Sequence, residues 1–148
     1  MLFRSKTYGI VPYIVTKKGV KILLCLDVAS DNKWGCLKGT KVKNETAFMC
    51  AKREFFEESS IEVDIALFEN YFEQINIDKD IGIWLVNANN IDNLDKLFVN
   101  DTLKANYLSW ENSKVKFFPL NNLPRIKSKQ TNLLKEIKDF LQSKNLHH

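Results

Sequence analysis

Three glutamates at helical spacing are the feature that most constrains this chain. Glu54, Glu57 and Glu58 stand at positions i, i+3 and i+4 in the run REFFEE, which begins at Arg53. On a helix they share one face, and like charges this close repel one another and weaken the helix. The cluster is therefore either a solvated acidic face or a site for a neutralising partner. A hard divalent cation such as Mg²⁺, which takes oxygen ligands, is the natural partner.

A second carboxylate precedes this run. Glu45 lies eight residues before Arg53, a separation of about 12 Å along a straight helix. A direct pair between the two side chains therefore requires Glu45 to lie in a loop or first turn and to fold back. Gly39 is expected to end the extended segment that comes before this loop.

The segment Gly39 to Ile61, GTKVKNETAFMCAKREFFEESSI, resembles the Nudix box. This is the signature of hydrolases that act on nucleoside diphosphates linked to another group. All charged positions of the box are filled. Ser60 is the one departure, because the family usually has glycine there. Glycine suits a left-handed helix end better than serine does, so we expect the departure to affect the helix exit rather than the metal site.

The resemblance implies a fold and a cofactor. The fold is of the α/β class, a Nudix-like α/β/α sandwich with a mixed sheet. The cofactor is Mg²⁺ or Mn²⁺, with Glu54, Glu57 and Glu58 as ligands and the carbonyl of Gly39 completing the metal site. Divalent ions neutralise a pyrophosphate, orient it and lower the pKa of a bound water.

The remaining catalytic roles are also assigned as expectations. Arg53 is expected to orient a glutamate through charge-assisted hydrogen bonds, with Glu45 as its partner or as an outer group. The general base is either a box glutamate, for which Glu57 is the candidate, or a glutamate from a later loop. Glu111 is the leading loop candidate and Glu73 the weaker one. For both, the competing interpretation is a plain surface charge.

The residues just before the box suggest contacts to substrate. The run WGCLKG, from Trp34 to Gly39, is similar to the WGxPKG run of diadenosine-polyphosphate hydrolases and RNA 5′-pyrophosphohydrolases, with Leu37 in place of the usual proline. Lys38 and Trp34 are the candidate substrate contacts. A solvated surface lysine is the competing interpretation of Lys38, and strand packing is the stronger interpretation of Trp34.

Hydrolysis of a nucleoside polyphosphate, including a dinucleoside one, is the leading function. Two alternatives stay open: processing of RNA 5′ ends, and a Nudix domain that senses a nucleotide without turnover. The 22 basic and 18 acidic residues form no evident basic run, which weighs against extensive RNA contact. A homodimer is a family-level expectation only.

The composition places the whole chain in one class. Its 148 residues, 45% hydrophobic and 27% charged, predict a single globular domain over residues 1–148. The three cysteines lack CxxC spacing and are interpreted as reduced core thiols of a cytoplasmic protein. Neither a signal-peptide core nor a membrane-spanning run is found. His147 and His148, native or left from a tag, are given no role.

Periodicity predicts the elements that surround the box. Pro12 argues that the first strand lies at a sheet edge or carries a bulge. Asn44 is the predicted N-cap of the box helix, and Phe48, Ala51 and Phe55 are its predicted buried stripe. The predicted strands cover residues 7–16, 20–26, 34–37, 61–68, 69–77, 81–86 and 114–118, and the predicted helices cover 46–59 and 131–141. Leu94, Leu97 and Phe98 have helical spacing within the polar segment 87–106.

Overall fold

The computed structural model describes residues 4–144 and 146, and a mixed sheet is its largest element. The strands are β1 Ser5–Thr16, β2 Gly19–Asp27, β3 Trp34–Gly35, β4 Leu37–Thr40, β5 Tyr71–Ile75, β6 Lys79–Asn87, β7 Phe98–Val99, β8 Thr102–Leu103 and β9 Asn112–Pro119. Their order is β5-β6-β1-β2-β9-β8-β7, with β3 paired to β2 and β4 paired to β1. β1 runs parallel to β6 and antiparallel to β2 and β4, so the sheet is mixed.

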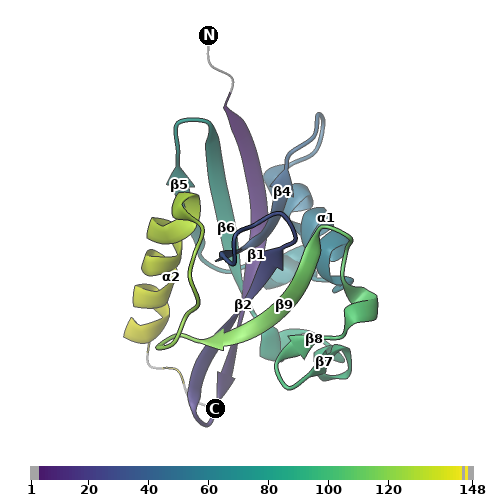
Figure 1. Cartoon of the computed structure of the whole chain (residues 1–148), viewed down its shortest axis with the longest axis vertical. Helices are drawn as coiled ribbons and strands as arrows, with labels where there is room; N and C mark the ends of the chain where they lie inside the picture. Colours follow the sequence, from purple (N-terminus) through teal and green to yellow (C-terminus); the bar gives the residue numbers. More distant parts are fainter. Residues whose placement is uncertain (1–3, 145, 147–148) are drawn as a thin grey trace.

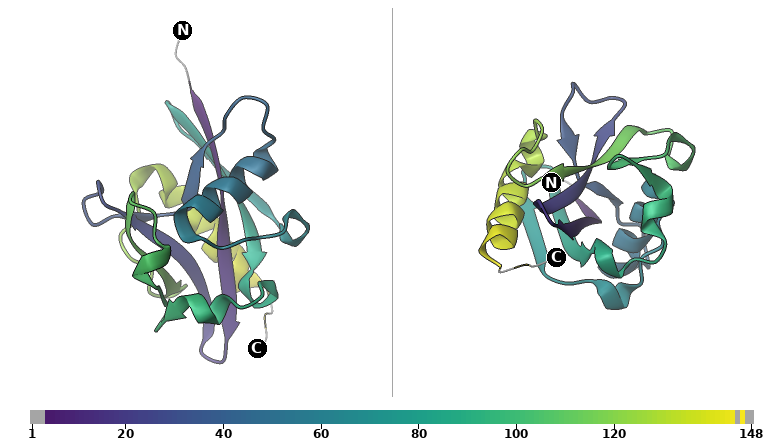
Figure 2. Two further views of the ribbon diagram at one scale, coloured as in Figure 1. Left: turned by 90° about the vertical axis from the view of Figure 1, so that its right-hand side faces the viewer. Right: turned by 90° about the horizontal axis from the view of Figure 1, so that it is seen from below.

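Two helices cover opposite faces of this sheet (Figure 1). Helix α1 spans Ala47–Ser59 and helix α2 spans Thr131–Ser143. Short 3-10 helices occupy the connections: η1 Ile65–Leu67, η2 Ala88–Asn90, η3 Leu94–Leu97, η4 Ala105–Tyr107 and η5 Ser128–Gln130. The view from below in Figure 2 shows the sheet between α2 and α1. The predicted α/β/α sandwich with a mixed sheet is confirmed.

The alternation of side chains along β1 explains why both helices are needed. Ile10 packs into the core beneath α1, whereas Val11 and Tyr13 pack into the core beneath α2. Successive side chains of a strand point to opposite faces, so a strand that is apolar at consecutive positions must be covered on both. Phe55 of α1 and Leu133 of α2 are fully buried in the respective cores.

The position of Pro12 corrects one prediction. β1 lies in the middle of the sheet, and Pro12 is paired with Val86 of β6. On its other edge, β1 pairs with β4 up to Ile10 and with β2 only from Tyr13 onward. A proline has no N–H to donate, and the gap between these two partners accommodates it without an edge position.

The stretch that follows α1 corrects a second prediction. Residues 61–68 form no strand; they pass through coil into η1. The carboxylate of Asp64 accepts a hydrogen bond from the backbone N–H of Ala66 at 2.9 Å. Such a local contact offers the backbone an alternative to strand pairing.

The other predicted strands and both helices are confirmed within a few residues. The predicted strand 34–37 is divided, because its first part pairs with β2 and its last residue begins β4, which pairs with β1. The three cysteines, Cys25, Cys36 and Cys50, are free and buried. No helix among residues 4–144 is long and apolar enough to cross a lipid bilayer. His147 and His148 lie outside the described residues.

Candidate metal and phosphate site

Helix α1 begins about two turns before the glutamate cluster. Thr46 is its N-cap, and the Thr46 hydroxyl accepts a hydrogen bond from the backbone N–H of Met49 at 3.1 Å. The prediction of Asn44 as the cap was wrong. Asn44 adopts a left-handed conformation with φ of 69° in the preceding loop, which asparagine tolerates better than most residues do.

The inner face of α1 also differs from the prediction in one residue. Ala51 and Phe55 are fully buried, but Phe48 is 44% exposed. The Phe48 ring lies 4.7 Å from that of Trp84 on β6 and packs beside Phe68. Phe48 therefore belongs to a half-exposed aromatic group at the edge of the core rather than to the core itself.

Arg53 is the hub of the charged face of α1. Its Nε and Nη2 atoms donate to the two carboxylate oxygens of Glu45, each at 2.8 Å. Its Nη2 atom also donates to the carbonyl of Thr40 at 3.2 Å. Its Nη1 atom donates to Glu54 at 2.9 Å and to Glu57 at 3.2 Å. One guanidinium thus joins β4, the following loop and two of the three box glutamates.

The predicted pairing of Glu45 with Arg53 is therefore present. Glu45 lies ahead of the helix and folds back, and it also accepts a hydrogen bond from the backbone N–H of Val42 at 3.0 Å. The Arg53 hydrogen bonds lower the pKa of Glu45 to about 2. This carboxylate is consequently ionised across the physiological range and holds Arg53 in place.

Glu58 is the box glutamate that Arg53 does not reach. Only 9% of the surface of Glu58 is exposed, and its Oε2 atom is buried without a hydrogen-bond partner among the described residues. Burial, reinforced by the charge of Glu54, raises the pKa of Glu58 to about 8; the nearby charge of Lys38 partly offsets this rise. A buried carboxylate oxygen without a partner is costly, so this site favours a proton or a cation.

Gly39 makes room for the second glutamate. A Cβ atom at this position would lie 1.9 Å from the carboxyl carbon of Glu54, so only glycine lets the carboxylate sit against β4. The Gly39 carbonyl accepts from the thiol of Cys50 on α1 at 3.5 Å. Burial raises the pKa of Glu54, and the hydrogen bond from Arg53 opposes the rise. The carbonyl and the carboxylate thus lie on the same side of β4.

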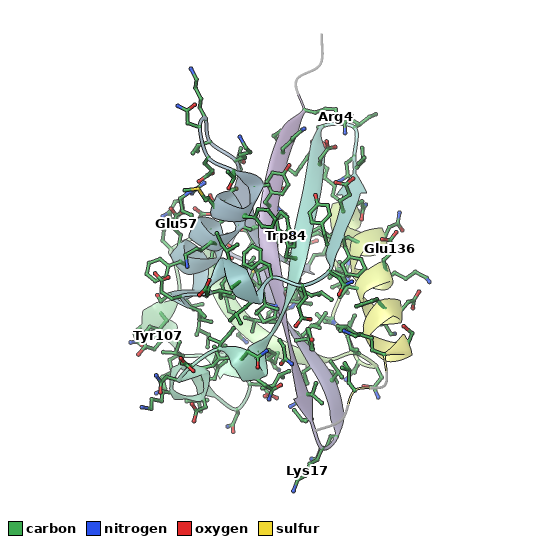
Figure 3. All side chains as sticks on the ribbon, turned by 180° about the vertical axis from the view of Figure 1, so that it is seen from behind. Arg4, Lys17, Glu57, Trp84, Tyr107 and Glu136 are labelled. Carbon is green, nitrogen blue, oxygen red and sulfur yellow. The ribbon has the colours of Figure 1, made fainter. Side chains whose placement is uncertain are left out.

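The carboxylates of Glu54, Glu57 and Glu58 are the candidate ligands of a divalent cation. In the described part of the chain, no three His, Cys, Asp or Glu side chains are grouped as they would be around a bound ion. Glu57 lies on α1 (Figure 3), and its side chain is 54% exposed and pairs with Arg53. The unpartnered oxygen of Glu58 and the all-oxygen chemistry of Glu54 and Glu57 nevertheless fit Mg²⁺ or Mn²⁺.

Glu111 and Glu73, the two loop candidates for the general base, lie in different places. The charge of Glu111 contributes, after burial and nearer charges, to raising the pKa values of both Glu54 and Glu58. Glu111 is exposed in the turn before β9, and its carbonyl accepts from Val28 at 2.9 Å. Glu73 lies on β5 and accepts from the Tyr71 hydroxyl at 2.9 Å. The charge of Glu111 thus acts on the glutamate cluster, whereas the side chain of Glu73 contacts Tyr71 on β5.

The two candidate substrate contacts also separate. Lys38 is half-buried on β4, and its charge is close enough to Glu58 to affect the pKa of that carboxyl. Trp34 packs edge-on against Phe118 with ring centroids 4.7 Å apart. Its backbone is held by Arg125 and Lys127. These contacts agree with the packing interpretation of Trp34.

Ser60 ends α1 in the left-handed conformation that the family usually gives to glycine, with φ of 63° and ψ of 14°. The Ser60 hydroxyl donates to the carbonyl of Tyr107 at 3.0 Å. This contact ties the end of the helix to η4. The departure from glycine thus lies at the helix exit, where the Ser60 hydroxyl contacts Tyr107.

Sequence reasoning missed one set of charged residues. Lys33, Lys79 and Lys127 gather beside Lys38 around one cavity. They come from three distant segments, and none stands in a recognisable motif. The pairing of β1 with β4 and β6 brings Lys38 and Lys79 together, and the bridge between Trp34 and Ile126 brings Lys33 and Lys127 together.

No protein-family model matches the chain, and no curated protein matches it in sequence. Solved structures do match. An Ap4A hydrolase from C. elegans, in a binary complex, has a TM-score of 0.66 at 21% identity over 95% of this chain and 99% of its own. A NUDIX hydrolase from Nitrosomonas europaea has a TM-score of 0.67 at 18% identity over 100% and 78%.

A third neighbour was solved with a ligand. The NUDIX domain of Shewanella oneidensis NrtR, complexed with ADP ribose, has a TM-score of 0.67 at 14% identity over 95% of this chain and 90% of that one. At these identities the likeness concerns the fold. The chain has the Nudix fold, with its glutamate-rich helix α1 in the position that the sequence predicted.

Proposed function

We propose that the protein is a metal-dependent pyrophosphohydrolase that cleaves a nucleoside diphosphate linked to another group, with a nucleoside or dinucleoside polyphosphate as the leading substrate. The buried, unpartnered Oε2 atom of Glu58 beside Glu54 carries this proposal. An uncompensated carboxylate at this depth destabilises the fold, whereas a bound divalent cation would compensate its charge. The Ap4A hydrolase fold neighbour supports the substrate class.

The side chains divide the work as follows. Glu54, Glu57 and Glu58, with the Gly39 carbonyl, would hold Mg²⁺ or Mn²⁺, which supplies charge neutralisation and a more acidic water when bound. Arg53 positions Glu54 and Glu57 by donating to both carboxylates. These contacts restrict the rotamers of two flexible side chains, which is how an outer group tunes a ligand.

Two residues act on the substrate side of the proposal. Glu111, whose charge is felt by both Glu54 and Glu58, is proposed as the base that removes a proton from the attacking water. It is exposed and can accept that proton and release it to solvent. Lys38 is proposed to contact a phosphate oxygen as a point charge.

A substrate panel tests the proposal. Wild type, Glu57→Gln and Glu136→Gln are assayed with Mg²⁺ and then Mn²⁺, and phosphate products are read by chromatography. Glu136 is an exposed glutamate on the far helix α2, so its variant controls for the loss of one charge (Figure 3). We expect metal-dependent cleavage that falls about a hundredfold or more in Glu57→Gln only, since outer-shell changes alone cost about 10–100-fold.

The same panel separates the alternatives. The NrtR neighbour, a NUDIX domain complexed with ADP ribose, keeps nucleotide binding without turnover as the second candidate function. Tight nucleotide binding by a folded wild type with no product under either metal would establish that candidate and overturn the hydrolase proposal. Cleavage restricted to 5′-triphosphorylated RNA would move the substrate class to RNA ends.

A further inference from the structure

A cavity of about 310 Å³ lies on the side of β4 that faces away from the glutamates. Five lysines line it and define what we call the lysine pocket: Lys33, Lys38, Lys79, Lys127 and Lys129. They come from the loop after β2, from β4, from the start of β6 and from the segment that leads into α2. Residues far apart in sequence thus place five cationic side chains around one space.

The lysines of the pocket outnumber the carboxylates beside them, although Asp31 also belongs to the lining. Lys127 pairs with Asp27, and Lys129 pairs with Asp78. Lys33, Lys38 and Lys79 have no ion-pair partner among residues 4–144 and 146. Burial and the neighbouring charge of Lys79 lower the pKa of Lys38. Like charges held together without partners repel one another, and a bound anion removes that cost.

The lining also indicates which anion fits. Lysine contacts phosphate oxygens as a compact charge with three donors. Ser30, Ser128 and Gln130 add uncharged polar groups, Asp31 adds one carboxylate, and Ile81 is the single large apolar side chain of the lining. No aromatic ring belongs to the lining, so a nucleobase would find no stacking platform there. The volume of the lysine pocket is at the lower end of the range for small-molecule pockets. It is larger than a single small ion needs.

The lysine pocket adjoins the proposed metal site through one strand. Successive side chains of a strand point to opposite faces. Gly39 faces Glu54, and Lys38 is turned into the pocket. The Lys38 charge nevertheless acts on Glu58. A phosphate chain that extends past the edge of β4 could therefore contact both sites at once.

We propose that the lysine pocket binds the phosphates of the substrate that lie away from the bond being cleaved. The protein then selects substrates with three or more consecutive phosphates over those whose second group is an uncharged sugar. The identity of the ligand as a substrate rests on the proposed function. Anion binding by the pocket does not, because it needs neither metal nor turnover.

Binding of inorganic tripolyphosphate in EDTA, measured by calorimetry, tests the pocket alone. Lys33→Gln/Lys79→Gln removes two of its unpaired charges. Lys17→Gln/Lys18→Gln removes two exposed charges from the β1–β2 turn and has the same net charge. We expect the dissociation constant to rise about tenfold or more in the pocket variant. In the turn variant it should change by less than about twofold, since Lys17 and Lys18 are exposed, do not line the pocket and are screened by salt.

Equal affinities of the two variants, or no binding by wild type, would overturn the proposal. Thermal unfolding of each variant confirms that it is folded; a single Lys79→Gln change, tested in the same way, replaces the double variant if that one is unstable. A kinetic arm separates the two proposals. Hydrolysis that persists with unchanged selectivity in the pocket variant overturns the pocket only. Tripolyphosphate binding without hydrolysis of any nucleotide overturns the proposed function only.

Discussion

The guanidinium of Arg53 and the carboxylate of Glu45 form a bidentate ion pair, in which Nε and Nη2 each donate to a different carboxylate oxygen at 2.8 Å. This pair fixes the loop after β4 to the middle of α1. It also leaves the third nitrogen, Nη1, free to hold Glu54 and Glu57. The geometry depends on a planar group with several donors, which lysine lacks.

Arg53→Lys is therefore expected to reduce kcat by about 10–100-fold while the protein stays folded. Lysine keeps the charge but cannot donate to Glu45 and to both box glutamates at once. Steady-state kinetics on the substrate found in the panel measures the change. Lys135→Arg on the outer face of α2, where the lysine pairs with Asp139, is the matched control and should retain wild-type kcat. A fully active Arg53→Lys enzyme would show that a positive charge alone is enough to position the box glutamates.

Gly39→Ala tests the contact between β4 and Glu54. The new Cβ would overlap the Glu54 carboxylate, which is the flexible end of a side chain and can move away. We expect a change in unfolding free energy within about 1 kcal/mol, together with a loss of Mg²⁺ affinity of tenfold or more. Urea unfolding and metal titration measure the two quantities.

Gly9→Ala is the informative contrast to that variant. Its Cβ would lie 2.1 Å from the backbone oxygen of Leu37 on the paired strand β4. Backbone atoms cannot move aside as a side chain can, so this change should destabilise the fold by several kcal/mol. If Gly39→Ala proved as destabilising as Gly9→Ala, the Glu54 contact would be structural rather than functional.

Ser60 gives a prediction about stability alone. A left-handed backbone costs an L-residue about 1–2 kcal/mol, and glycine avoids this cost. The hydrogen bond to Tyr107 returns about 0.5–1.5 kcal/mol. Ser60→Gly is therefore expected to be near neutral, and Ser60→Ala to lose about 1 kcal/mol. Urea unfolding gives the order, and an alanine variant as stable as wild type would remove the hydrogen bond from the explanation.

The sequence predicted the fold and the glutamate face for a clear reason. The glutamate face follows from the 3.6-residue spacing of α1, whereas the sandwich fold was implied by the resemblance of residues 39–61 to the Nudix box. Pro12 and the lysine pocket were beyond such patterns. Pro12 is tolerated in a central strand only because β1 changes partner from β4 to β2 beside it. Lys33 and Lys79 meet only through sheet topology.

The assignment of a neutralising partner shows the same limit within the site. The prediction that the three like charges of the box need a neutralising partner is correct. The sequence pointed to a cation for all three, whereas Arg53 already contacts Glu54 and Glu57 in the structure. Rotamers within one helix face decide this division, and spacing does not encode them. Glu58 alone is left with an unpartnered oxygen.

Glu58 therefore yields a prediction on pH. Its pKa rises from 4.5 to about 8 on folding, so the folded state favours the protonated carboxyl. The contribution of the protonated Glu58 carboxyl to the stability of the fold is present in full below pH 4.5 and is lost as the pH rises through 8. In EDTA, wild type should lose stability relative to Glu58→Gln between these two pH values, by a few kcal/mol at most.

Urea unfolding at pH 5 and pH 8 measures this difference, with Glu136→Gln as the exposed control, whose stability should follow that of wild type. At pH 8, adding Mg²⁺ should make wild type more stable than Glu58→Gln, because an ion that binds only the folded state stabilises that state. At a hundred times the dissociation constant the gain is about 2.7 kcal/mol, or roughly 5–10 °C in Tm for a chain of this size. Glu58→Gln should gain far less. A Tm that Mg²⁺ raises equally in both proteins would place the cation away from Glu58.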